Sequence, residues 1–174
     1  RGDVLEQLGK YDEALRDYNK VIELNPDYPG AYYNRGDLFM NQKKYNEAEA
    51  DFKKAITLNP SVVEGYYNLG SLYMETGKNE EALHNFNQAI TINPQCFEAY
   101  FNKASTLFAM QRFDEAISNY SHAITIQPQS ADAYINKALA ENSAGKKSDA
   151  CADLQKAANL GYAVSDEMTK QLCQ

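Results

Sequence analysis

The chain has 174 residues, of which 44% are hydrophobic and 24% are charged, and its formal net charge is −7. A pI near 4.9 argues against binding to nucleic acid or anionic lipid, because both need clustered lysine and arginine. No apolar run reaches the ~18 to 20 residues of a membrane span, and no secretory signal is present. We therefore expect a single domain over residues 1–174, with a partner that is more basic or polar than acidic.

Four of the five prolines recur at a constant 34-residue period, and each follows a segment of the form hydrophobic, any residue, Leu or Ile, Asn or Gln. This period is typical of one small supersecondary unit that stacks on copies of itself. Proline lacks an amide donor and restricts the residue before it, so each proline is expected to end a helix. These prolines are Pro26, Pro60, Pro94 and Pro128.

Large aromatic residues alternate with very small ones at the same period. A ring on one helix can fill the space that alanine or glycine leaves on another, which lets two helices pack closely. The columns are Ala14, Ala48, Ala82, Ala116 and Ala150; Tyr18, Phe52, Phe86, Tyr120 and Leu154; Tyr32, Tyr66, Tyr100 and Tyr134; and Gly36, Gly70, Ala104 and Ala138.

Each unit is predicted to contain two helices, for example over residues 30–42 and 45–58. A short polar turn such as Thr76-Gly77-Lys78 joins the two helices, and the Asn-Pro segment separates one pair from the next. Because the connections are short, successive helices must be antiparallel neighbours.

The segment Tyr66-x-x-Leu69-Gly70-x-x-Tyr73, followed by Ala82, Phe86 and Pro94, resembles the tetratricopeptide repeat signature, with tyrosine in place of its usual tryptophan. The resemblance implies an all-α, right-handed superhelical solenoid of antiparallel helix pairs. Its last units depart from the pattern, with Glu141 in an apolar column and Tyr162 where proline is due. It divides the chain into a partial repeat 1–28, full repeats 29–62, 63–96, 97–130 and 131–164, and a capping segment 165–174. Because Arg1 falls within an expected helix, we expect a fragment or a processed form.

Four asparagines lie at equivalent positions of the four first helices, on the stripe opposite the one formed by Tyr32, Gly36 and Phe39. Asparagine costs roughly 0.6 kcal/mol relative to alanine inside a helix, so four in register require a reason. A primary amide can donate to and accept from a peptide backbone at once. These asparagines are Asn34, Asn68, Asn102 and Asn136.

A similar asparagine ladder occurs in the repeat domain of O-linked N-acetylglucosamine transferases, where it holds the substrate backbone. In tetratricopeptide proteins the first helices line the concave groove, so the resemblance implies that the ladder lies inside it. Two alternatives stay open: the ladder copies an ancestral unit, or each amide bonds to a neighbouring helix.

Acidic, hydroxyl and aromatic residues accompany the ladder, and no lysine or arginine shares its stripe. An acidic groove flanked by aromatic rings favours a basic or polar segment, although a solvated acidic face is an equal alternative. Capture of a partner's C-terminal carboxylate, as by co-chaperone repeat domains, is disfavoured because basic groove residues are missing. The candidate peptide-binding residues besides the asparagines are Tyr33, Asp37, Glu64, Tyr67, Ser71, Glu98, Phe101, Ser105 and Asp132, with Asp3 on the same stripe.

The three cysteines form neither a disulfide framework nor a zinc motif. Buried or idle thiols are one interpretation. The other pairs Cys151 with Cys173 and thereby clamps the C-terminal end. The ending around Cys151, Leu160-Gly161-Tyr162 and Cys173 also resembles the caps of some bacterial repeat proteins thought to be exported. We expect a cytoplasmic location by default and an exported one if the disulfide forms.

No cofactor, metal site or catalytic centre is expected, because no nucleophile stands near a base. The adhesion-like tripeptides Arg1-Gly2-Asp3 and Arg35-Gly36-Asp37 follow from the repeat pattern, since their glycines fall on a packing face. Two functions remain. The first is an interaction scaffold that binds an extended or helical segment of a partner. The second is a structural, regulatory or self-associating segment of a larger protein, for example of an enzyme.

Overall fold

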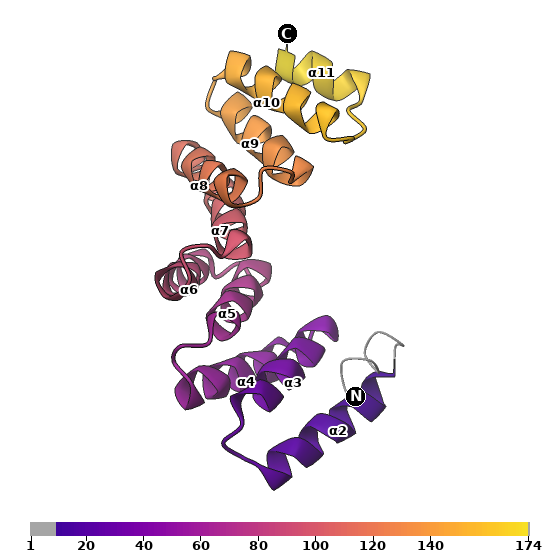
Figure 1. The fold of residues 1–174 in the computed structure, drawn as a ribbon, viewed down its shortest axis with the longest axis vertical. Helices are drawn as coiled ribbons and strands as arrows, with labels where there is room; N and C mark the ends of the chain where they lie inside the picture. Colours follow the sequence, from indigo (N-terminus) through magenta and orange to yellow (C-terminus); the bar gives the residue numbers. More distant parts are fainter. Residues whose placement is uncertain (1–9, 174) are drawn as a thin grey trace. The chain divides into compact units, whose positions relative to one another are not determined.

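A computed structural model describes residues 10–173, and this part of the chain is all-helical (Figure 1). Arg1-Gly2-Asp3, with the stripe residue Asp3, and most of the predicted first helix of the partial repeat lie outside the described residues. The all-α prediction is confirmed, and the expected pair 30–42 and 45–58 is found within one residue. The helices are α2 (Tyr11–Leu24), α3 (Pro29–Asn41), α4 (Tyr45–Leu58), α5 (Val63–Glu75), α6 (Asn79–Ile92), α7 (Phe97–Ala109), α8 (Phe113–Ile126), α9 (Ala131–Ser143), α10 (Lys147–Asn159) and α11 (Asp166–Cys173).

Each periodic proline occupies the second position of the same turn between two repeats. The amide of Val62 donates to the carbonyl of Asn59 at 3.3 Å, and the three equivalent turns contain the same bond. The Asn59 side chain also accepts a hydrogen bond from the amide of Ser61 at 3.1 Å. Proline suits this position because its φ is already that of a turn, and asparagine suits the position before it because its side chain folds back on the backbone. The turn therefore explains the Asn-Pro pairs.

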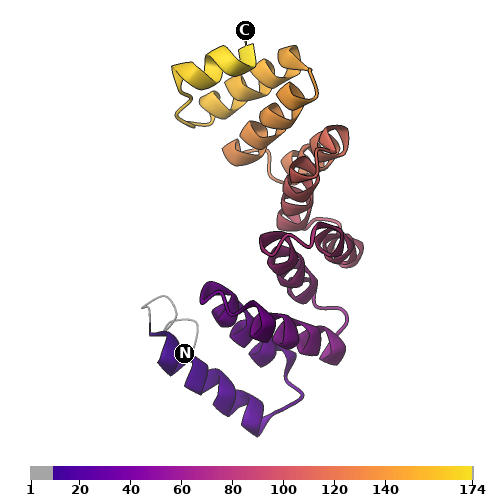
Figure 2. The same ribbon diagram turned by 180° about the vertical axis from the view of Figure 1, so that it is seen from behind.

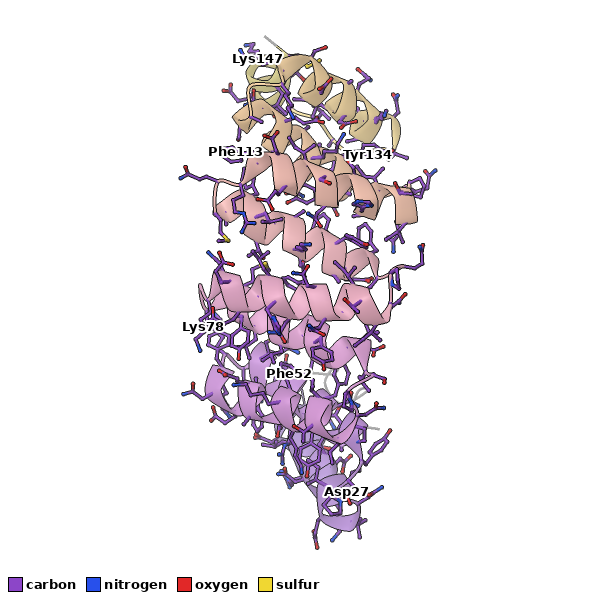
Figure 3. The ribbon with its side chains drawn as sticks, turned by 90° about the vertical axis from the view of Figure 1, so that its left-hand side faces the viewer. Asp27, Phe52, Lys78, Phe113, Tyr134 and Lys147 are labelled. Atoms are coloured by element: carbon purple, nitrogen blue, oxygen red, sulfur yellow. A yellow bond between two sulfur atoms is a disulfide. The ribbon has the colours of Figure 1, made fainter. Side chains whose placement is uncertain are left out.

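The turns within the repeats also share one conformation. Lys43, Gly77, Gln111 and Gly145 have positive φ angles of 58°, 74°, 61° and 79°. They recur at the period of the prolines, so each marks the same left-handed position after a first helix. Glycine adopts this conformation without the steric penalty that other residues incur. Residues 93–174 form one compact unit. Within it, Phe113 and Lys147 follow two of these turns and lie at one side, and Tyr134 lies at the other (Figure 3).

The alanine column, the column from Tyr18 to Leu154 and the column from Gly36 to Ala138 are buried, whereas the tyrosine column is buried only at Tyr32 and half-buried in the later repeats. A Cβ placed on Gly36 would lie 2.7 Å from a ring carbon of Phe52, and one placed on Gly70 would lie 2.7 Å from a ring carbon of Phe86. Both rings are fully buried. Such a distance is shorter than van der Waals contact, so only glycine lets these helices approach with a phenylalanine between them.

The helices group into two compact units, Arg1–Ile92 and Asn93–Gln174, and each is described by itself. In the first unit α3 packs on α4, α5 packs on α6, and α3 also touches α5. In the second unit α7 packs on α8, α9 packs on α10, and α7 also touches α9. The single domain expected from the sequence stays a prediction.

Glu141 departs from the apolar column Phe39, Tyr73 and Leu107 because the fourth repeat carries a partly buried ion network. Its side chain is 4% exposed and lies 3.0 Å from the Nζ of Lys137, which also pairs with Asp153 on α10. Burial raises the pKa of the Glu141 carboxyl. A buried charge is tolerated only where a counter-charge is close, and Lys137 provides it.

Helix α11 lies against α10 and ends the second unit (Figure 2). It occupies the place in the sequence of a fifth first helix, one period after α9. Leu172, in the column of Gly36, Gly70, Ala104 and Ala138, is 1% exposed. A disulfide joins Cys151 to Cys173, with 4.9 Å between their Cα atoms, and Cys96 is buried and lies outside this bond. Of the two interpretations of the cysteines, the structure shows the one in which Cys151 and Cys173 form a disulfide.

Candidate peptide-binding surface

The four asparagines lie on first helices: Asn34 on α3 and Asn68 on α5 in the first unit, and Asn102 on α7 and Asn136 on α9 in the second. They stand at the same turn of each helix because the repeat period is constant. Asn34, Asn102 and Asn136 are half-buried, whereas Asn68 is buried, with 7% exposure. Within each unit, two amides therefore occupy equivalent places on helices that touch each other.

The asparagine amides also have partners inside the chain. The Asn68 amide is hydrogen-bonded to the hydroxyl of Tyr33 across the contact between α3 and α5. The Asn136 Nδ2 donates to the carbonyl of Asp132, one turn earlier in its own helix, at 2.8 Å. Asn34 and Asn102 also interact within the chain. For Asn68, the alternative that a ladder amide bonds to a neighbouring helix therefore has a direct observation behind it.

The aromatic residues beside the asparagines pack on the second helix of their own repeat. The Tyr33 ring centroid lies 6.5 Å from that of Phe52, and the Tyr67 centroid lies 6.4 Å from that of Phe86. In the second unit the Phe101 ring meets Tyr120 edge-on at 5.5 Å. All three residues keep part of their surface exposed. Contact with the second helix therefore fixes the three rings, and the exposed part of each ring offers an apolar edge.

The two predicted serines are bonded to their own helices. The Ser71 Oγ donates to the carbonyl of Tyr67 at 3.0 Å, and the Ser105 Oγ donates to that of Phe101 at 3.1 Å. Ser71 is also buried, with 8% exposure. Hydroxyls bonded in this way are weaker candidates for partner contacts than the amides are.

The acidic candidates fall into two structural classes. Glu64, Glu98 and Asp132 are exposed and lie in the first turns of α5, α7 and α9. A carboxylate there stabilises the positive end of the helix dipole. Asp37 differs because it lies in the second half of α3 and is half-buried. Burial raises the pKa of its carboxyl.

Of the three basic residues next to ladder asparagines, Arg35 and Lys137 are bonded to second helices. The guanidinium of Arg35 donates two hydrogen bonds of 2.7 Å to the carboxylate of Asp51, and Lys137 pairs with Asp153. Lys103 is half-buried and burial lowers its pKa. The sequence pattern could have predicted the two pairs, because both join the same two positions of their repeats.

Tyr33, Asp37, Glu64, Tyr67 and Asn68, here called the α3–α5 cluster, lie within electrostatic range of one another. Burial raises the pKa of the Tyr33 hydroxyl, the Asn68 hydrogen bond opposes that rise, and the charges of Asp37 and Glu64 add to it. The sequence columns contained all five residues. What they did not predict is the hydrogen bond between Tyr33 and Asn68, because it depends on the spacing of α3 and α5.

Among residues 10–173, no group of three or more His, Cys, Asp and Glu side chains is arranged to hold a metal ion. None of the helices in that range combines the length and apolar character needed to cross a membrane.

Solved structures with a similar fold cover most of the chain. MamA shares 28% sequence identity with a TM-score of 0.84, over 92% of this chain and 94% of that one. YrrB, described as a TPR protein with an unusual peptide-binding site, shares 26% identity with a TM-score of 0.75, over 91% and 82%. TTC0263, a thermophilic TPR protein in Thermus thermophilus, shares 24% identity with a TM-score of 0.72, over 91% and 87%, and supports the fold alone. No curated protein sequence matches the chain.

Family models match most of the sequence. A TPR repeat model matches residues 2–43, and a tetratricopeptide repeat model matches residues 29–62, 63–96 and 97–130. The last three ranges are those given by the proline spacing. The helix pairs, the glycine and phenylalanine contacts and these matches agree, so the chain belongs to the tetratricopeptide repeat family, whose members are helical solenoids that act as scaffolds for protein interaction.

Proposed function

We propose that the chain binds an extended or helical peptide segment along its first helices, with the ladder asparagines bonding to the segment's backbone. The observation that carries the proposal is the register of Asn34, Asn68, Asn102 and Asn136 on first helices of both units. The half-buried aromatic edges beside them provide apolar contact, and the acidic residues give the surface a preference for basic or polar segments. The similarity to YrrB, a TPR protein with a peptide-binding site, supports the proposal.

The intramolecular bonds of the amides do not prevent this role. An amide has two donors and an acceptor with two lone pairs, so the single bond from Asn136 to its own helix leaves further capacity. Bonds to the peptide backbone do not depend on side chains, so such a surface accepts many sequences. The role we propose is binding and not catalysis.

The double variant Asn102→Ala/Asn136→Ala should bind a peptide selected from a phage-displayed library of random 12-residue peptides about tenfold more weakly than the wild type. Two lost hydrogen bonds at ~0.5–1.5 kcal/mol each account for that factor. Isothermal titration calorimetry measures the affinity, and circular dichroism checks that helicity is kept.

Asn87→Ala/Asn119→Ala is the matched control, because both of its residues lie on second helices and Asn119 bonds to its own helix as Asn136 does. The control should bind like the wild type. Undiminished affinity in Asn102→Ala/Asn136→Ala would show that the ladder does not grip the peptide.

Self-association is the alternative function, and one observation favours it. On α2, Val21 is 38% exposed and Leu24 is 73% exposed. The residues equivalent to Val21 in the later repeats, Ala55, Ala89, Ala123 and Ala157, are all fully buried. The apolar face of α2 is therefore more exposed than the equivalent faces of the later repeats, and a second copy of the chain would bury it.

If α2 mediates self-association, the mass from light scattering should rise with protein concentration, and Leu24→Glu should abolish the rise. Lys20→Ala, an exposed change on the same helix, should leave it intact. A constant monomeric mass at millimolar concentration would exclude the alternative.

A further inference from the structure

We propose that Asp37 is the residue that sets the preference for a basic partner, and that it receives one lysine or arginine side chain of the bound segment beside Tyr33 on α3. This inference rests on the proposed function and names the chemistry of one position in it. It assigns the preference to one carboxylate of the first unit, in place of the acidic surface as a whole.

The other acidic candidates have a structural role that explains them. Glu64, Glu98 and Asp132 each stand in the first turn of a helix, where negative charge stabilises the helix, and each is exposed. Exposed charges are strongly screened by water and salt, so each adds little to binding. Asp37 is not in a first turn, and its half-buried position screens it less.

Two other partly buried carboxylates of the first unit have basic partners, and Asp37 has none among the described residues. Asp51 is bonded to Arg35, and Glu49 is paired with Lys53 and Lys78. No lysine or arginine of residues 10–173 is paired with Asp37, and burial raises the pKa of its carboxyl. A desolvated carboxylate without a counter-charge lowers the stability of the fold. Carboxylates of this kind occur at binding sites, because a ligand of opposite charge removes the loss of stability.

The surroundings of Asp37 suit a long basic side chain. Tyr33 lies one helical turn before Asp37, and its ring is fixed by packing against Phe52. Asn68 holds the Tyr33 hydroxyl from α5, and Glu64 adds negative potential at the same ring. The methylene stem of lysine or arginine can lie along an aromatic ring while its charged end reaches a carboxylate.

The repeat period shows that this arrangement occurs once among the described first helices. The residues equivalent to Asp37 are Ser71, Ser105 and Leu139, none of which is charged. The serine hydroxyls are bonded within their own helices. The segment should therefore need one basic residue at a fixed position, and not a general positive charge.

The test is selection of phage-displayed random 12-residue peptides on the wild type and on Asp37→Asn at 150 mM salt. Peptides selected on the wild type should share one position that is lysine or arginine, and those selected on Asp37→Asn should have no such position. Replacing that residue by glutamine in a synthetic peptide should weaken binding to the wild type about tenfold, as expected for a partly buried bond to a charged group. The same replacement should weaken binding to Asp37→Asn less than about twofold.

Glu47→Gln is the matched control, since Glu47 is an exposed carboxylate of the same unit that lies in the first turn of α4, a second helix outside the candidate surface. It should keep the basic position and the tenfold effect. A basic position that persists on Asp37→Asn would overturn the inference and leave the proposed function standing. Failure of the wild type to select any peptide would count against the proposed function, and the inference would fall with it.

A second measurement shows whether Asp37→Asn has damaged the fold. The folded-state pKa of Asp37 is raised. The stability that the protonated carboxyl contributes to the fold is therefore fully present below its ordinary pKa, and it is lost as the pH rises through the folded-state pKa. At pH 7 Asp37→Asn should therefore be more stable than the wild type to urea, and below about pH 4 the two should converge. Tyr33, Glu64 and Tyr67 face the same surface and are unchanged in the comparison. If Asp37→Asn is more stable than the wild type and selects peptides without a basic position, the Asp37 carboxylate serves recognition of the peptide and not folding.

Discussion

Phe86→Ala is expected to lower the free energy of unfolding by about 3–5 kcal/mol, because it empties the space between α5 and α6. The Phe86 ring is fully buried and lies against Gly70, whose missing side chain makes room for it. Gly70 has no side chain that could move into the cavity, so the loss should be near the upper end of the range. Urea unfolding followed by circular dichroism measures it.

A size exchange provides the control for this prediction. Gly70→Ala should cost about 1–3 kcal/mol, because its Cβ would lie 2.7 Å from the ring. The double variant Gly70→Ala/Phe86→Leu should recover most of that loss, since the fourth repeat already combines Ala138 with Leu154, both buried. If the effects of the two changes simply add, the contact between Gly70 and Phe86 is not what sets the helix spacing.

The helix pairs and their core could be predicted because they depend on local rules that recur in every repeat. Proline after asparagine ends a helix wherever it occurs, and a ring needs a small neighbour at the same spacing each time. Both rules apply within a single repeat. Glu141 broke the pattern in the sequence, and its explanation needed Lys137 and Asp153 to be seen together.

The chemistry of the candidate surface could be predicted only in part. The sequence columns identified which residues share a stripe, but not which of them are already engaged. The hydrogen bond from Asn68 to Tyr33 depends on the distance between α3 and α5, and the period does not specify that distance. In the same way, Asp37 and Glu64 lie on the same acidic stripe in the sequence, and the structure shows that they differ in burial.

Reducing the Cys151–Cys173 disulfide should lower the stability of the second unit by about 3 kcal/mol. The bond closes a loop across a sequence separation of 22, and the stabilisation of such a loop comes mainly from restricting the unfolded chain. Helix α11 has only eight residues, too few to be stable without its contacts to α10 and α9. Hydrogen exchange should therefore show the amides of α11 losing protection first when the bond is reduced.

The matched comparison is Cys151→Ala/Cys173→Ala against Cys96→Ala, since Cys96 is a buried cysteine outside the disulfide. The double variant should behave like the reduced protein, and Cys96→Ala should keep the protection of α11. Equal stability of the oxidised and reduced proteins would show that the bond does not hold the end of the unit. Because structural disulfides persist in oxidising surroundings, we propose a compartment outside the cytoplasm. Alkylation of the protein as it is recovered from its cells, followed by mass spectrometry with and without reductant, tests this: freely alkylated Cys151 and Cys173 would contradict it.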